Sequence, residues 1–137
     1  MAVTIRTHEE LKDRLFPYIS AVSDELSKFI RERNIHGRAY PGAHSTDRHV
    51  IVYVSYLPEN DPSRETIDAT ISVGLSSDSL HLTADVCESN GRVLFEAEDH
   101  LVPAGNWASA VESVEGVSAV ASAKLLDYMK KHLTDLT

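Results

Sequence analysis

The chain has 137 residues, of which 42% are hydrophobic and 25% are charged, a composition typical of one soluble globular domain and unlike that of disordered chains. The sequence shows neither a basic stripe nor a glycine-rich phosphate loop, which argues against nucleic-acid and nucleotide binding. The single cysteine, Cys87, excludes an internal disulfide, and no apolar run approaches the roughly 18 residues of a membrane span. We therefore predict a single domain over residues 1–137, located in the cytoplasm and without a membrane partner.

The formal net charge of −8 comes from one block of the sequence. Residues 57–99 hold ten acids and two bases, a difference of eight, whereas the rest of the chain holds eleven of each. The same block has the alternating pattern of β-strands, so the charge is expected on a sheet. An acidic sheet face repels phosphate and attracts metal ions or basic protein surfaces.

The first predicted element is a helix over residues 7–33, where apolar residues recur at steps of three and four. Thr7 and Glu10 have the spacing of a capping box, so we expect the helix to begin at Thr7. Pro17 lies inside this pattern, which keeps its phase across the proline. That continuity favours a kinked helix or two short helices end to end.

Residues 35–48 contain Gly37, Pro41 and Gly42 and are predicted to form a long connection. Four strands follow. The first, residues 49–57, is apolar on both sides of its alternation, as in a strand that is covered on both faces or lies in an interface. The other three strands alternate regularly; they cover residues 67–75, residues 80–87 and the stretch from residue 93 onward.

Two short loops set the predicted register. Asn90 and Gly91 indicate a two-residue hairpin of type I′, in which the numbers of paired residues sum to 181. A second short loop at Ser77 and Asp78 gives pairs whose numbers sum to 155. In both hairpins apolar residues then lie opposite apolar residues, which supports the pairing.

After the strands, Asn106 is expected to cap a helix that begins at Trp107, and Gly116 to bend or divide it. The predicted fold is therefore α+β: an N-terminal kinked helix, a four-stranded antiparallel meander and a C-terminal helix or helix pair, arranged as a two-layer sandwich. The apolar pattern exceeds what one sheet face can bury, so we expect a homodimer.

The predicted register gathers polar residues on one face of the sheet. It places His81 opposite His100, Thr83 opposite Glu98, and Asp85 opposite Glu96, and Cβ atoms of such pairs lie about 4.5 to 5.5 Å apart. Like charges at this distance are destabilising unless a cation or a proton lies between them. The candidate binding residues are His81, Thr83, Asp85, Glu96, Glu98 and His100.

Two functions are compatible with this face. The favoured one is a non-enzymatic module without a cofactor that binds a protein partner, for instance a basic one. Small acidic proteins that neutralise toxins or chaperone secreted proteins are comparable in size and charge. The alternative is a small metal-dependent or acid/base enzyme that uses His81, His100, Asp85 and Glu96, with residues 35–48 as a lid. No HExxH or CxxC spacing supports the metal, and a solvated face without any partner explains the same residues.

Overall fold

The structure is a computed structural model that describes residues 5–59 and 65–136. Along the chain, one helix precedes five strands and a second helix follows them: α1 (Ile5–Glu32), β1 (Gly37–Ser45), β2 (His49–Pro58), β3 (Ile67–Leu75), β4 (Ser79–Glu88), β5 (Val93–Pro103) and α2 (Trp107–Leu136). The strands form one antiparallel sheet in chain order. The fold is α+β as predicted, but the sheet has five strands rather than four. Asp61 and Arg64 of the acidic block lie outside the described residues.

The strand that the sequence analysis missed is β1, which occupies most of the predicted connection. Its glycines and Pro41 are typical of turns, and they hid the strand. In the structure the ring of Tyr53 lies over Gly42 and that of Tyr56 over Gly37, so the tyrosines fill the space that these glycines leave. The segment is therefore an edge strand and not a lid.

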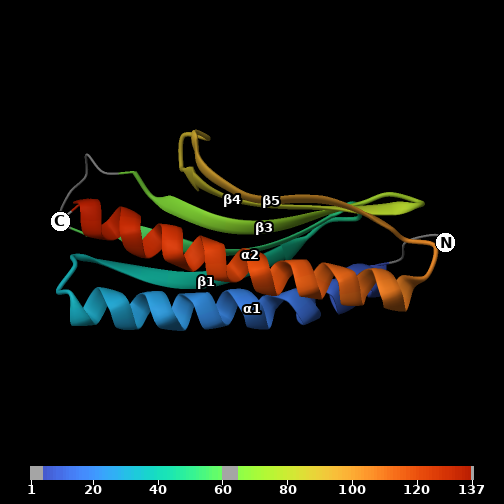
Figure 1. Cartoon of the computed structure of the whole chain (residues 1–137), viewed down its shortest axis with the longest axis horizontal. Coiled ribbons are helices and arrows are strands. Elements are labelled where there is room, and N and C mark those ends of the chain that lie inside the picture. Colours follow the sequence, from blue (N-terminus) through green and yellow to red (C-terminus); the bar gives the residue numbers. More distant parts are fainter. Residues whose placement is uncertain (1–4, 60–64, 137) are drawn as a thin grey trace.

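Both helices pack on the same face of the sheet, α1 over β1 and β2, and α2 over β3 to β5 (Figure 1). Because an odd number of antiparallel strands connects them, the two helices run in the same direction. Alternate strand residues meet the apolar stripes of the helices in one core. Its fully buried large side chains include Tyr56, Ile71, Leu80 and Leu82 from the strands and Leu15, Ile19, Leu26, Leu125 and Met129 from the helices.

The helix boundaries correct one prediction and decide between the alternatives in two others. Helix α1 begins at Ile5, before Thr7, so the capping box does not mark its start. It continues across Pro17 as one helix rather than two, and α2 likewise continues through Gly116 undivided. The predicted cap is confirmed, because the side-chain oxygen of Asn106 accepts a hydrogen bond from the Ser109 amide at 3.1 Å. Among the helices described, none is long and apolar enough to cross a membrane.

The register between β3 and β4 is confirmed: Leu75 pairs with Leu80, and all pairs sum to 155. The next hairpin differs from the prediction. Of its two turn residues only Gly91 has a positive φ, 91°, and the Glu88 amide donates to the Arg92 carbonyl at 2.9 Å. The hairpin loop therefore contains three residues, with the left-handed glycine last, and is not a type I′ turn.

Strands β4 and β5 are further displaced by two irregularities, between Ala84 and Asp85 and between Val86 and Cys87. Each gives β5 one extra residue. Two pairs keep the predicted sum of 181, Asp85 with Glu96 and Val86 with Phe95, whereas every pair from Ala84 toward the start of β4 sums to 182. A slip of one residue moves each side chain to the other face. Most of the predicted β4–β5 register is therefore wrong.

Candidate functional site

The face of the sheet that faces away from the helices carries most of the charge of the strands. Its acids are Asp68 on β3, Asp85 on β4, and Glu96 and Asp99 on β5, and we call these four residues the acidic face. One base, Arg38 on the far edge strand β1, lies on the same side of the sheet. Three of the four acids belong to two neighbouring strands, so their negative charge is concentrated at one side of the sheet.

The slip in β5 divides the predicted binding residues between the two faces. His81, Thr83, Asp85 and Glu96 lie on the uncovered face, as expected, whereas Glu98 and His100 lie on the helix side. His81 is not opposite His100. Its Nε2 instead lies 2.6 Å from Oδ1 of Asp99. The predicted pair of facing histidines is therefore wrong.

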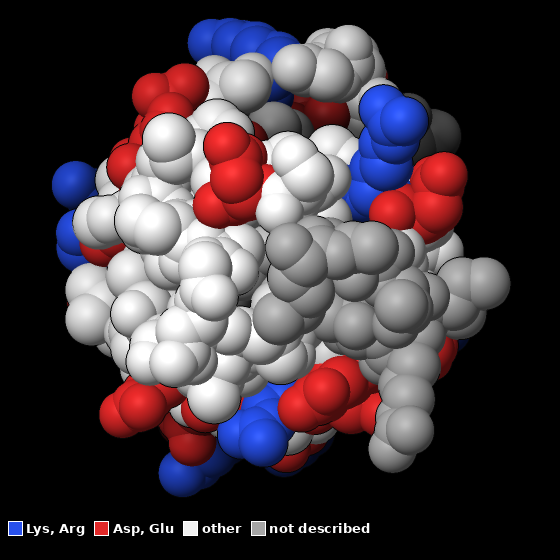
Figure 2. Space-filling model, turned by 90° about the vertical axis from the view of Figure 1, so that its right-hand side faces the viewer, with Lys and Arg blue, Asp and Glu red and all other residues white. Residues whose placement is uncertain are grey.

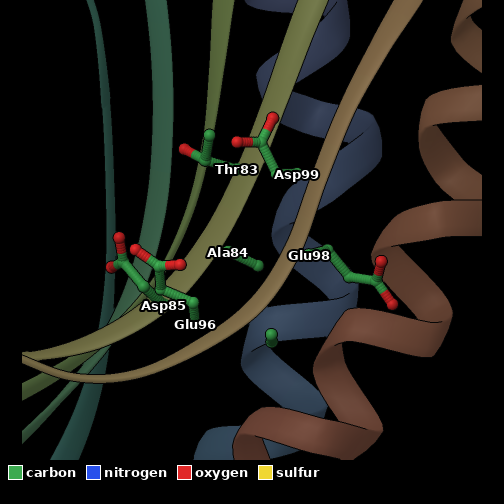
Figure 3. Close-up of a pocket in the computed structure, with 7 residues that line it drawn as sticks. Thr83, Ala84, Asp85, Glu96, Glu98 and Asp99 are labelled. Atoms are coloured by element: carbon green, nitrogen blue, oxygen red, sulfur yellow. The ribbon is translucent and has the colours of Figure 1, made fainter.

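Glu98 connects β5 to helix α2. Its carboxylate accepts a hydrogen bond from Nζ of Lys124 at 2.7 Å and lies 2.6 Å from Nε2 of His100. Lys124, and to a smaller extent His100, holds the pKa of Glu98 below its ordinary value. In the close-up view the Glu98 side chain points toward α2, away from the other carboxylates (Figure 3). Its role is therefore structural, and it does not belong to the acidic face.

Asp85 and Glu96 lie side by side on the uncovered face, with Thr83 and Asp99 grouped beside them (Figure 3). These four residues line an open hollow at the irregularity between β4 and β5. Like charges that lie this close repel each other, so a cationic side chain placed between them would relieve an unfavourable interaction. The hollow can therefore accept a positive group.

Cys87 lies next to this pair and donates a hydrogen bond from Sγ to Oδ1 of Asp85 at 3.4 Å. Burial, and then the negative charge of Asp85, raises the pKa of its thiol to about 11. Such a thiol is protonated at neutral pH and is a poor nucleophile. The cysteine thus adds no covalent chemistry to the hollow.

The other half of the uncovered face is aromatic and apolar. Tyr53 and Ile51 of β2 point to this side, and Tyr40 of β1 is exposed at the edge, with the Arg38 guanidinium 6.0 Å from its ring. Between the two halves, the Ser55 hydroxyl donates a hydrogen bond to Asp68. This arrangement explains why residues 49–57 are apolar on both sides: one side meets α1, and the other forms part of an open surface.

Within residues 5–59 and 65–136, no three His, Cys, Asp or Glu side chains are placed to hold a metal ion. The facing histidines, on which the enzyme alternative rested, are on opposite faces of the sheet. What the arrangement offers instead is a row of carboxylates on an accessible surface. That geometry suits the binding of cationic groups better than the activation of a water molecule.

Asp99 is the member of the acidic face that the sequence analysis did not assign to it. A signal was present, because Glu98 and Asp99 are consecutive acids in a strand that otherwise alternates. Two neighbouring charged residues indicate that one of them points to the helix side or that a bulge intervenes. At the end of the molecule on the right of Figure 1, the described surface beside the grey residues is mostly uncharged, and acidic and basic side chains lie chiefly toward its rim (Figure 2).

Comparison with known proteins gave no relatives: neither a protein-family model, nor a curated protein, nor a solved structure matches this chain.

Proposed function

We propose that this protein is a non-enzymatic binding module whose uncovered sheet face docks a basic surface of a protein partner. The observation that carries the proposal is the acidic face: Asp68, Asp85, Glu96 and Asp99 lie on a face that neither helix covers. The charged groups of a strand can be solvated on such a face, but they are also free to bind. Complementary charge steers a basic partner to this surface and sets its orientation.

The neighbouring aromatic half supports a protein partner rather than a small cation. Tyr40 and Tyr53 offer apolar area with a polar hydroxyl, and tyrosine is enriched in protein interfaces. A partner with Lys or Arg beside an apolar side chain would contact both halves at once. Small acidic proteins that neutralise toxins or chaperone secreted proteins provide an analogy in size and charge. With one cysteine in the whole chain, we place this module in the reducing cytoplasm.

The experiment compares capture of a partner from the native host by two variants of equal charge. In the first, D68N/D85N/E96Q/D99N, the acidic face is neutralised. In the control, E32Q/D47N/E59Q/D135N, four exposed acids outside this face are neutralised. Removal of four acids from a net charge of −8 leaves −4 in both variants. Amides keep the shape of the side chains, so both variants are expected to fold.

We expect the unmodified protein and the control to retain a basic protein that the acidic-face variant loses. Retention should also weaken with added salt, because exposed charges are screened beyond about 8 Å at physiological ionic strength. Equal loss in both variants would mean that only the total charge matters. Equal retention by both, or capture of an acidic protein alone, would also contradict the proposal.

A further inference from the structure

A second surface, on the outer side of the helices, has no part in the proposed docking of a basic protein. Residues 15–23 of α1 and residues 116–123 of α2 contain no Asp, Glu, Lys or Arg. Each segment spans more than two turns of helix. Surface helices ordinarily carry charged residues on their solvent side. We call these two segments the uncharged patch.

The two segments lie side by side. Just before them, Nη1 of Arg14 and Oε1 of Glu115 are 3.4 Å apart. A groove between the helices follows, lined mostly by small and apolar residues: Pro17, Tyr18, Ala21, Ala119, Ala123 and Leu126. Val120 beside it is 52% exposed. A contiguous apolar strip of this kind marks an interaction surface more often than a solvated one.

The groove also contains an unpaired polar group. Ser122 lines it and is only 7% exposed. Its Oγ has no hydrogen-bond partner among the residues that the structure describes. A buried hydroxyl without a partner is destabilising, so a rotation of the Ser122 side chain toward a polar group of an occupant would relieve this cost.

Helix α2 carries opposite charges on the two sides of the patch. Residues 107–115 contain two acids, Glu112 and Glu115, and no base, whereas residues 124–131 contain three bases and one acid, Asp127. The helix dipole does not account for this polarity, because it acts on the terminal turns, and α2 has no acid in its first turn and no base in its last. In α1 both kinds of charge occur on each side of the patch.

We propose that the uncharged patch binds a second copy of this chain, with the two α2 helices antiparallel across a two-fold axis near Val120. Because Glu115 and Lys124 already pair with Arg14 and Glu98 within the chain, the contact is between Glu112 of each α2 and Lys131 of the other. The uncharged segments meet in the middle. A two-fold axis repeats the favourable contact at both ends. The acidic face could not serve here, because two copies would bring like charges together.

The first test measures molecular mass by sedimentation velocity at about 100 μM, where a micromolar dimer is formed. We expect twice the chain mass of 15.1 kDa. Val120→Glu, which places a charge at the centre of the patch, should give the monomer. Its matched control is Leu101→Glu, a change of the same kind on the uncovered face, where Leu101 is 70% exposed; this variant should remain dimeric. A monomeric wild type, or a dimeric Val120→Glu variant, would overturn the proposal.

The second test uses exposed charges whose removal does not threaten folding. Glu112→Lys and Lys131→Glu should each weaken the dimer about three- to tenfold, because each removes two symmetry-related ion pairs. The double variant E112K/K131E restores opposite charges across the antiparallel contact and should recover the wild-type affinity. A double variant weaker than both single variants would exclude the antiparallel arrangement. All these variants leave the acidic face intact, so loss of the dimer and loss of a basic partner are separate results.

Discussion

The two faces of the sheet are formed by alternate residues of the same strands, yet they differ in composition and exposure. On β4, Leu80, Leu82 and Ala84 are buried against the helices, and His81 and Thr83 between them face outward. The helix-covered face is apolar and closely packed. The other face is polar, acidic in β3 to β5 and aromatic in β1 and β2.

This difference indicates where stability and binding reside. Burial of apolar area dominates the free energy of folding, so the covered face holds the fold together. The uncovered face contributes little to that energy and can therefore carry clustered like charges without unfolding the domain. Residues on this face can therefore be suited to binding a partner without loss of stability, which is the role proposed for the acidic face.

The largest expected effect compares two neighbouring residues of β4. Leu82 is fully buried on the covered face, whereas Thr83 lies on the uncovered face. Leu82→Ala should lower the free energy of unfolding by about 2–5 kcal/mol, because it leaves a cavity in the core. Thr83→Ala should change it by no more than about 0.5 kcal/mol. Urea denaturation measures both, and comparable losses would contradict the separation of the two faces.

The alkylation rate of the Cys87 thiol measures the effect of the neighbouring Asp85 charge. The thiol pKa, raised from 9.0 to about 11, should slow alkylation by iodoacetamide about a hundredfold at neutral pH relative to an unperturbed thiol, since the thiolate reacts. Asp85→Asn removes the neighbouring charge and should speed the reaction. The gain should be partial, because burial is the largest cause of the shift.

The control for this measurement is Glu32→Gln on α1, which removes a charge far from the thiol in sequence and outside the uncovered face. It should leave the alkylation rate unchanged. Equal rates for the wild type and Asp85→Asn would mean that the charge of Asp85 does not act on the Cys87 thiol.

Much of this arrangement could be predicted from the sequence, because periodicity reports directly on burial. The register of β3 with β4 was correct, since a shift of one residue would have exposed Leu80 and Leu82. Strand β1 was missed because its glycines and Pro41 are turn-forming residues. The two tyrosine rings that lie over those glycines come from another strand, and local sequence does not show such contacts.

The candidate site was predicted in part for the same reason. The register changes in β5 between Glu96 and Glu98. The candidate residues that come before this point in the sequence were assigned to the correct face: His81, Thr83, Asp85 and Glu96. Glu98 and His100 come after it. An extra residue in one strand is not visible in a pattern of period two unless the alternation visibly fails, as it does at Asp99.

Ser118 is a polar exception among the apolar side chains that are buried between the sheet and the helices. Its side chain is fully buried in α2, and its Oγ has no hydrogen-bond partner in the part of the chain that the structure describes. Ser118→Ala should raise the free energy of unfolding by about 1–2 kcal/mol, because it removes an unpaired buried hydroxyl and favours the helix. Ser113→Ala, an exposed serine of the same helix, should give only the smaller gain from helix propensity. Thermal unfolding of both variants measures the difference, which should be a few degrees.

The smallest expected effect concerns Glu98, which the irregularity in β5 places on the helix side. Its pKa lies below the ordinary value of 4.5 because of Lys124 and then His100. The ionised carboxylate is favoured in the folded state, so its stabilisation is present above pH 4.5 and is lost as the pH falls through the lowered pKa. Lys124→Met keeps the apolar stem and removes the charge. It should lower Tm by a few degrees at about pH 7, and by progressively less as the pH falls through the lowered pKa of Glu98.

An NMR titration of the Glu98 carboxyl should show its pKa rising toward 4.5 in Lys124→Met. Lys28→Met, on the exposed side of α1, is the control and should leave the titration unchanged. If the difference in Tm between wild type and Lys124→Met stayed constant below the pKa that the titration gives for Glu98, the ion pair between Lys124 and Glu98 would not be what stabilises the protein. The charge of Glu98 would then contribute nothing to the attachment of β5 to α2, and the bulge would serve only to bring Asp99 onto the acidic face.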